Sequence, residues 1–259
     1  MSHTSSTNAQ ASKTGRSLRA DGHVHIYNCY DSSVALQSAA RNLRSAHAPS
    51  SQDELAIFLT ERSDCDFFAK LSGEEATPEV KRVSDLWVFA GRQLATRERM
   101  EVLALGTRQT FSDGLAFEEA LRKVQEAGAI PVIPWSPGKW MFGRAHILGS
   151  VLERAKPGDL LLADSSLRPI GWPQPAFFEM ARERGIGILA GSDPLPFAEQ
   201  EPLIGSFGFR LASGFDPAAP LDSVRKCLLA PAPSCEVIGK RLSILGVLSR
   251  LYCNRAARR

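Results

Sequence analysis

The 259-residue sequence has no long hydrophobic run, and it is poor in cysteine and histidine, with five of each. No apolar stretch approaches the roughly 20 residues that a membrane-spanning helix needs, so we expect no transmembrane segment. The cysteines form no C-x-x-C pair, and an odd number in a chain of this length is not typical of a disulfide-stapled secreted domain. Reduced thiols and a cytoplasmic location are therefore expected.

The N-terminus also lacks the apolar central region of a secretory signal. Residues 1–18 are rich in serine and threonine, which predicts a disordered N-terminal tail. The net charge is only +3 and the pI is about 8.7, so the composition gives no strong nucleic-acid signal.

After the tail, strand-like apolar runs alternate with helical patterns, which predicts parallel βα units. At this length a closed or nearly closed α/β barrel over residues 19–235 is the expected architecture. Residues 236–259 predict a basic amphipathic helix, which either docks on the barrel or contacts an anionic surface. The strand-like runs are HVHIY, ELAIFLTE, the two halves of LWVFAGRQLATRERMEVLALG, AIPVIPW, DLLLADSS and IGILAGSD.

Two of the five histidines, His23 and His25, stand one residue apart in the first strand-like run. Side chains alternate between the faces of a strand, so these imidazoles share one face, together with Asp21. Two imidazoles and a carboxylate that converge at a strand end are a plausible metal-ligand set. The alternative is a hydrogen-bonded pair of core histidines without a metal.

Polar residues recur where the predicted strands end, which is where βα barrels carry their chemistry. If these ends converge, they form one pocket with histidines, carboxylates and cations. Taken singly, Asp164 and Asp193 could instead cap the turns that follow them, and Glu61 could form a solvated salt bridge. The strand-end residues that matter most for the chemistry are His23, His25, Glu61, Arg62, Lys139, Asp164, Arg168 and Asp193.

The order of these segments resembles the PHP family, named for polymerase and histidinol phosphatase. DGHVHIY is similar to the family's opening DxHxH, and LAIFLTERSD to its xxITDH segment. VFAGRQL and EVLALG are similar to xxGxEx and ExHLLG, AGAIPVIPWSPG to GGxxVLAHPG, and GILAGSDPLP to xxxGSDAH. The resemblance covers roughly residues 19–200 and implies a distorted (β/α)7 TIM-like barrel with metal-dependent phosphoesterase activity. An H-x-H pair with a late aspartate also occurs in amidohydrolases, which remain a neighbouring family.

The departures from the family pattern reduce the metal site that the resemblance implies. Neutral Gln93 stands in place of a glutamate, and Glu61 stands in place of an aspartate. Leucine and tryptophan offer no lone pair to a hard or borderline cation, and a glutamine removes negative charge. The positions that have lost a family histidine are Arg62, Leu103, Trp135 and Leu195.

What remains is compatible with a single divalent metal, Zn, Mn or Fe, held by His23, His25 and Asp193 with help from Glu61 or Asp164. Two functions follow from this reduced site. In the first, the protein is a divergent metal-dependent hydrolase of the phosphoesterase class, and Asp193 or Glu61 is the general base.

In this hypothesis the substrate is a small anionic, phosphorylated molecule, because guanidinium and ammonium groups suit such an anion. The expected substrate-binding residues are Arg62, Lys139 and Arg168. In the second hypothesis the barrel has lost catalysis and serves as a ligand- or protein-binding module.

Overall fold

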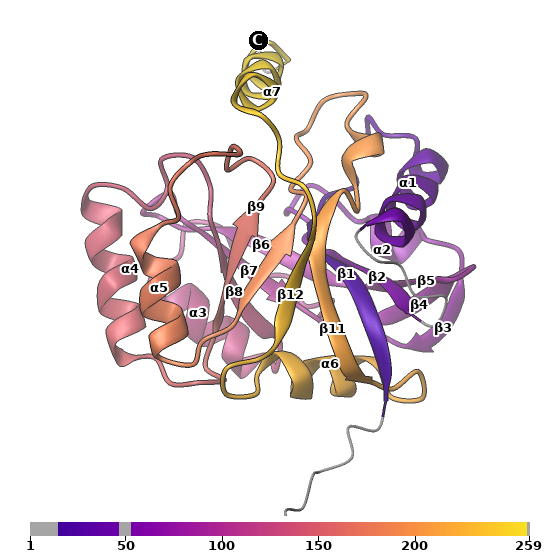
Figure 1. The fold of residues 1–259 in the computed structure, drawn as a ribbon, viewed down its shortest axis with the longest axis horizontal. Helices are drawn as coiled ribbons and strands as arrows, with labels where there is room; N and C mark the ends of the chain where they lie inside the picture. Colours follow the sequence, from indigo (N-terminus) through magenta and orange to yellow (C-terminus); the bar gives the residue numbers. More distant parts are fainter. Residues whose placement is uncertain (1–14, 47–52, 258–259) are drawn as a thin grey trace, which may run out of the picture.

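Two β-sheets form the centre of the molecule, and helices flank them (Figure 1). The computed structural model describes residues 15–46 and 53–257, so residues 1–14 of the predicted disordered tail lie outside the described part. Within that part, one sheet has the strand order β12-β11-β1-β2-β5-β4-β3 and the other the order β10-β9-β8-β7-β6.

The strands of the first sheet are β1 (Arg16–Val24), β2 (Glu54–Leu59), β3 (Glu74–Thr77), β4 (Val80–Val83), β5 (Leu86–Phe89), β11 (Phe207–Phe215) and β12 (Cys235–Gly239). The strands of the second sheet are β6 (Gly91–Ala95), β7 (Glu101–Leu105), β8 (Ile130–Pro134), β9 (Leu161–Ser165) and β10 (Ile188–Gly191). The helices are α1 (Ser32–Ser45), α2 (Phe67–Lys70), α3 (Phe117–Glu126), α4 (Gly143–Arg154), α5 (Ala176–Glu183), the short 3-10 helix η1 (Glu201–Leu203), α6 (Pro220–Leu228) and α7 (Ile244–Ala256).

The predicted α/β class is confirmed, but the described ladders form two sheets, so the predicted closed or nearly closed, distorted TIM-like barrel is not confirmed. The prediction assumed parallel βα units throughout, whereas β7 is antiparallel to both of its neighbours, β6 and β8. The short polar connection at residues 96–100 explains the first of these pairings, because only antiparallel strands can be joined so directly. In addition, β3, β4 and β5 form an antiparallel extension of the first sheet.

The two sheets approach each other where β10 lies beside β1. The backbone N–H of Asp193, just after β10, donates to the carbonyl oxygen of His23 at 2.9 Å. An isolated parallel bridge between Glu61 and Arg92 connects the sheets at a second place. The end of β1 is therefore brought next to the turn that follows β10, although those segments are about 170 residues apart in sequence.

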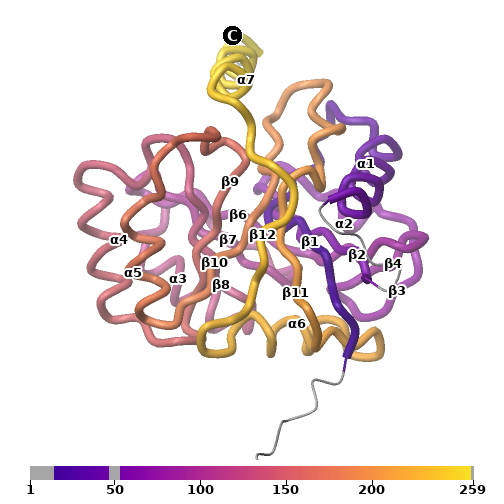
Figure 2. The backbone as a smooth tube through the Cα atoms, in the orientation of Figure 1, coloured from indigo at the N-terminus to yellow at the C-terminus, as the bar shows by residue number. Residues whose placement is uncertain are grey.

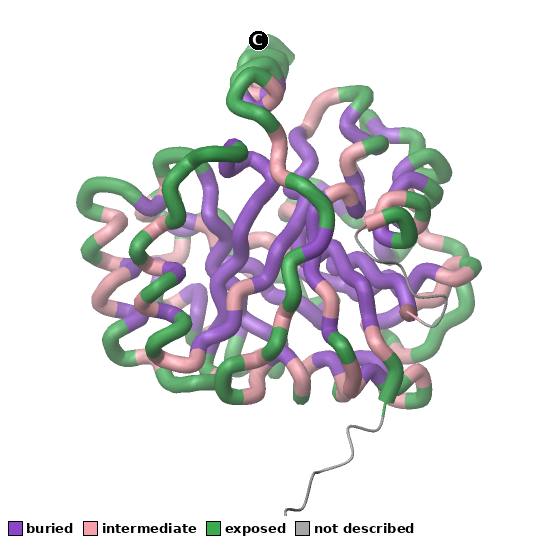
Figure 3. Tube along the Cα trace, in the orientation of Figure 1, coloured by how far each residue is buried: buried purple, intermediate pink, exposed green. Residues whose placement is uncertain are grey.

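Apolar side chains from both sheets pack between them and form a shared core. Phe58 of β2 stacks on Phe89 of β5 with ring centroids 4.6 Å apart, and on Phe209 of β11 at 6.2 Å. Each fully buried phenylalanine contributes about 1.5–3 kcal/mol. Figure 3 shows the central strands as almost continuously buried. The strand ends that carry the site therefore extend from a fully buried core.

The helices cover the outer faces because their apolar residues recur at helical spacing. In α3 the buried residues are Phe117, Ala120, Leu121 and Val124, one stripe at positions i, i+3, i+4 and i+7. This stripe packs, with residues of α4 and α5, against the second sheet. The helix ends before Gly128, whose φ of 66° is the left-handed conformation that glycine adopts without strain.

The C-terminal segment contains a strand before its helix. Residues Cys235–Gly239 pair with β11 as the antiparallel strand β12, and α7 begins after Ser243, whose hydroxyl accepts from the backbone N–H of Gly246 at 3.1 Å. In Figure 2 the chain leaves β12 and runs to α7 at one end of the molecule. None of the described helices is long and apolar enough to cross a bilayer.

Candidate metal centre

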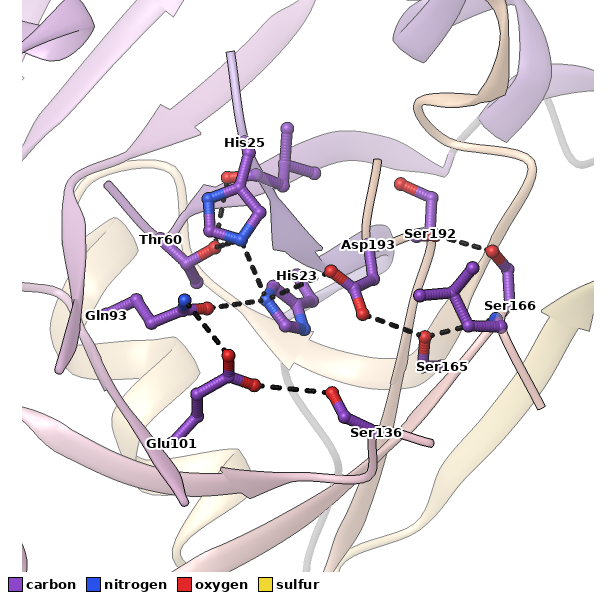
Figure 4. Close-up of polar contacts among 12 residues, drawn as sticks. His23, His25, Thr60, Gln93, Glu101, Ser136, Ser165, Ser166, Ser192 and Asp193 are labelled. Atoms are coloured by element: carbon purple, nitrogen blue, oxygen red, sulfur yellow. Dashed lines mark hydrogen bonds and ion pairs between the residues drawn. The ribbon is translucent and has the colours of Figure 1, made fainter. Parts of the chain in front are cut away.

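His23, His25 and Asp193 meet at the junction of β1 and β10 (Figure 4). The Nε2 atoms of the two imidazoles are 3.1 Å apart, and His23 Nε2 lies 3.6 Å from Asp193 Oδ1. One ligand atom from each residue lies within 4.8 Å of the others, and all three residues are buried. The structure therefore brings together the three residues that the sequence places at the core of its predicted metal site.

Backbone geometry explains why the aspartate reaches the histidines. The absence of a side chain at Gly191 lets β10 approach His23 so closely that a Cβ there would lie 2.5 Å from the His23 backbone nitrogen. Asp193 then adopts a φ of 49°, a left-handed conformation that aspartate tolerates better than most residues. This turn directs the carboxylate back toward β1.

Asp21 shares the strand face of the histidines but does not join their cluster. Its carboxylate accepts from the backbone N–H groups of Ser192 at 2.9 Å, Gly205 at 2.8 Å and His23 at 3.1 Å. Burial raises the pKa of Asp21 to about 6, against the opposing effect of these hydrogen bonds. Through the bond from Ser192, Asp21 holds β1 against the turn that carries Asp193 and so helps to position that carboxylate.

The neighbours of His23 Nε2 are mostly hydrogen-bond acceptors. Gln93 Oε1 lies 3.3 Å away, and its orientation is set by Glu101, which can only accept and takes the Gln93 amide N–H at 3.4 Å. Asp193 Oδ1 and His25 Nε2 face the same nitrogen. A single N–H at His23 Nε2 can donate to only one of these groups at full strength. Two acceptor oxygens, from Gln93 and Asp193, therefore compete for one N–H at this nitrogen.

Electrostatics keep two of the three ligands in the form that a metal requires. Burial, followed by the neighbouring His23, lowers the pKa of His25 to about 3, so its imidazole is neutral at physiological pH. Burial acts to raise the pKa of Asp193, but His23, His25 and Arg250 together lower it below its ordinary value. A neutral imidazole and an ionised carboxylate are the protonation states in which these groups bind cations.

The spacing of these atoms suits one cation. Ligand atoms held about 2.1 Å from one ion at tetrahedral angles lie roughly 3.4 Å from each other. The two separations from His23 Nε2, 3.1 Å to His25 and 3.6 Å to Asp193, bracket this value, and all three ligand atoms lie within 4.8 Å of one another. Two imidazoles and one carboxylate are also a common ligand set of catalytic zinc, which leaves a further position for water.

Glu61 lies outside the cluster of His23, His25 and Asp193, because backbone N–H groups of α2 bind its carboxylate. Oε1 accepts from the backbone N–H of Phe67 and, at 3.0 Å, from that of Phe68. Oε2 forms an ion pair with Arg92 Nη1 at 3.3 Å. The metal-ligand cluster found among the described residues does not include Glu61, which instead fixes the start of α2.

We expect Glu61→Gln to keep the metal content of the wild-type protein while lowering its free energy of unfolding by about 1–3 kcal/mol. The amide would weaken the bonds to Phe67 and Phe68 and remove the charge that faces Arg92. Urea unfolding and elemental analysis of the same preparation measure both effects. Loss of bound metal from this variant would return Glu61 to the ligand set.

The other sequence-predicted charges are paired with neighbours. Asp164 accepts from Arg168 Nε at 2.7 Å and also from its Nη2, so these residues neutralise each other in a buried pair. Lys139 forms an ion pair with Glu101. Arg62 is half-exposed and lies 3.4 Å from Asp64. Asp164 does not belong to the cluster of His23 and His25, because Arg168 occupies its carboxylate.

The structure adds residues to the site that sequence reasoning did not assign. Gln93, which marks a departure from the PHP pattern, still directs an oxygen at His23. Ser165 donates to Asp193 Oδ2 at 3.1 Å. Arg250 of α7 donates to Gln200 Oε1 at 2.6 Å and to the backbone oxygen of Asp193 at 3.3 Å. For Arg250, no local pattern in the sequence signals a contact with a turn 57 residues away.

Comparison with known proteins gives fold relatives and no close sequence relatives. No protein-family model and no curated protein matches the sequence. Among solved structures, PsfC from Pseudomonas syringae PB-5123 aligns with a TM-score of 0.57 at 12% identity, over 95% of this chain and 98% of PsfC. The lesion-specific endonuclease PfuEndoQ from Pyrococcus furiosus aligns with a TM-score of 0.54 at 12% identity, over 85% of this chain and 57% of the endonuclease.

A third structure is a two-domain protein from Bacteroides vulgatus ATCC 8482, described as containing a predicted PHP-like metal-dependent phosphoesterase. It aligns with a TM-score of 0.50 at 11% identity, over 93% of this chain and 70% of that protein. At these identities the comparisons establish a similar fold, and function must be argued from the site. The chain has a PHP-like α/β fold.

Proposed function

We propose that this protein is a metal-dependent hydrolase of the phosphoesterase class, with one divalent cation, Zn, Mn or Fe, held by His23, His25 and Asp193. The observation that carries the proposal is the convergence of possible ligand atoms on His23 Nε2, which Gln93 Oε1 and Asp193 Oδ1 face as acceptors and which lies 3.1 Å from His25 Nε2. A cation satisfies these groups together, whereas one proton cannot. The PHP-like fold is consistent with this chemistry.

When bound, such a cation lowers the pKa of a water ligand and polarises a phosphoryl oxygen. Within the chain, Asp193 Oδ1 faces the histidines, while Oδ2 accepts from Ser165. Ser165 thereby orients the carboxylate, which in this proposal also takes the proton of the attacking water. Gln93 completes the site as a neutral oxygen donor held in place by Glu101.

The burial of the site favours a second candidate, a fold retained for ligand or protein binding without catalysis. His23 is 1% exposed, His25 4% and Asp193 7%, and the Tyr27 ring stacks on His25 with centroids 5.2 Å apart. The Tyr27 ring therefore covers one face of the His25 imidazole. The two candidates differ in whether the purified protein holds metal and turns over substrate.

The test is the metal content of the purified protein and its dependence on His23. We expect about one equivalent of Zn, Mn or Fe by elemental analysis, lost in His23→Ala. His146→Ala is the matched control, because this histidine is exposed on α4, and it should keep the metal. A metal-free wild-type protein that chelators do not destabilise would contradict the metal site and favour the second candidate.

Catalysis is tested separately with a panel of phosphomonoesters in the presence of Mn²⁺. We expect turnover by the wild type and by His146→Ala, and loss of turnover in His23→Ala. A preparation shown to hold metal that hydrolyses none of these substrates would reject the phosphoesterase assignment while leaving the metal site intact.

A further inference from the structure

The helix α7 lies at one end of the molecule, and much of it is coloured as exposed (Figures 1 and 3). Its exposed large apolar residues are Ile244, Leu245, Leu248 and Tyr252. Leu245 is 75% exposed and Tyr252 is 76% exposed, with Leu248 between them at helical spacing. The opposite side of the helix attaches it to the protein through the buried residues Val247 and Arg250. Large apolar side chains in such a row are unusual on a surface that faces only water.

Two loops, residues 135–142 between β8 and α4 and residues 166–175 between β9 and α5, extend this apolar area beside α7. A groove of about 550 Å³ separates them from the helix, and it is lined by Trp135, Trp140 and Trp172 of the loops and by Leu248 and Leu251 of α7, among others. The loops also carry exposed apolar residues of their own. We call the whole area the α7 surface, and its exposed apolar residues are Met141, Phe142, Ile170, Trp172, Ile244, Leu245, Leu248 and Tyr252.

The segments that form the α7 surface carry only positive charge. Residues 135–152, 165–178 and 237–259 contain nine of the 31 Lys and Arg residues and none of the 28 Asp and Glu residues. The rest of the chain is therefore acidic, with 22 basic against 28 acidic residues. Among the described cations of these segments, Lys240 and Arg255 are exposed, whereas Lys139 and Arg168 are paired with Glu101 and Asp164 and Arg250 is buried. Such a surface selects an anionic partner.

The α7 surface combines exposed apolar side chains with cations, and the interface of a bilayer offers an apolar phase beside charged headgroups. Side chains such as Phe142, which is 82% exposed, need an apolar phase to enter, and the phosphate backbone of a nucleic acid does not offer one. A second copy of this chain would bring a like-charged surface against the first. Tryptophan and tyrosine are enriched at the headgroup level of membranes, where Trp172 and Tyr252 would lie.

We propose that the α7 surface binds the surface of anionic lipid bilayers. The apolar residues of α7 and the two loops enter the boundary between headgroups and acyl chains, and the cations contact lipid phosphates. The binding is peripheral, because α7 lies along the interface and does not span it. The proposal does not depend on the metal site.

The experiment measures how much of the full-length protein floats with phosphatidylcholine vesicles. The vesicles contain either no anionic lipid or about 25 mol% phosphatidylglycerol. We expect at least about tenfold stronger binding to the anionic vesicles, weakened by high salt. Leu245→Gln/Leu248→Gln should reduce binding at least about tenfold, since it removes two exposed apolar side chains without touching the core. Val34→Gln, at an exposed position on α1, is the matched control and should bind as the wild type does.

A second variant separates charge from apolar contact. Lys240→Gln/Arg255→Gln should weaken binding to anionic vesicles about 30-fold, because each of the two cations near such a surface contributes about 1 kcal/mol. Absence of binding to anionic vesicles, or equal binding by the Leu245/Leu248 variant, would overturn the proposal. Wild-type dimers that the Leu245/Leu248 variant cannot form, without vesicle binding, would assign the surface to a second copy. Binding to a DNA duplex without vesicle binding would assign it to nucleic acid.

Discussion

Gly191→Ala is expected to lower the free energy of unfolding by about 3 kcal/mol and to abolish metal binding. The added Cβ would lie 2.5 Å from both the Cβ and the backbone nitrogen of His23. These are not the ends of flexible side chains, so β10 and β1 would have to separate. The carboxylate of Asp193 would then move away from the imidazoles, and the hydrogen bond from its N–H to the His23 carbonyl oxygen would be lost.

Urea unfolding and elemental analysis measure the two effects of Gly191→Ala. Gly143→Ala is the matched control, because a Cβ at this helical position meets no atom within 4 Å. It should change stability by less than about 1 kcal/mol, in the stabilising direction, and leave the metal content unchanged. Wild-type stability in Gly191→Ala would show that the contact between β10 and β1 does not set the geometry of the site.

Asp193→Asn is expected to weaken binding of a divalent cation by at least about 100-fold and to remove phosphoester hydrolysis with it. Asparagine adopts the left-handed backbone conformation readily, so the φ of 49° is retained. The side-chain oxygen also remains available to Ser165. The substitution therefore removes the negative charge and little else.

Titration of the metal-free protein with Zn²⁺ or Mn²⁺, by calorimetry or by competition with a chelating dye, measures this loss. Glu61→Gln is the matched change of carboxylate to amide, and it should bind the cation as tightly as the wild type does. Equal affinities for wild type and Asp193→Asn would contradict a role for Asp193 as a ligand. Thermal unfolding with and without the cation gives a second readout, because a ligand that binds only the folded state raises its stability.

Several features of this protein could be predicted because they depend on residues close in sequence. Alternation along a strand places His23 and His25 on one face, and the structure shows their Nε2 atoms 3.1 Å apart. The end of the strand before Asp193 likewise places that carboxylate at a turn. The α/β class follows from the same local periodicities, whereas the barrel is not confirmed, because the described strands form two sheets and β7 is antiparallel to both of its neighbours.

The carboxylates and cations show where local reasoning ends. Glu61 and Asp164 follow predicted strands as Asp193 does, yet the first is held by the N–H groups of α2 and the second by Arg168. Gln93 stands where the PHP pattern has a glutamate, which predicts the loss of a ligand. In the structure its amide N–H donates to Glu101, so its oxygen faces His23. In each case the role of the side chain depends on which donors or acceptors the fold brings within hydrogen-bond distance of it.

The sequence by itself determined the α/β class, the strands that carry the two histidines and Asp193, and the shared face of the histidines. These properties depend on side-chain type and on the repeat of the backbone, both of which act over a few residues. Only the tertiary structure decided that the turn after β10 reaches His23, and that Arg250 of α7 contacts the same turn. Such contacts join segments far apart in the chain, and they form only where the packing of two sheets brings their edges together.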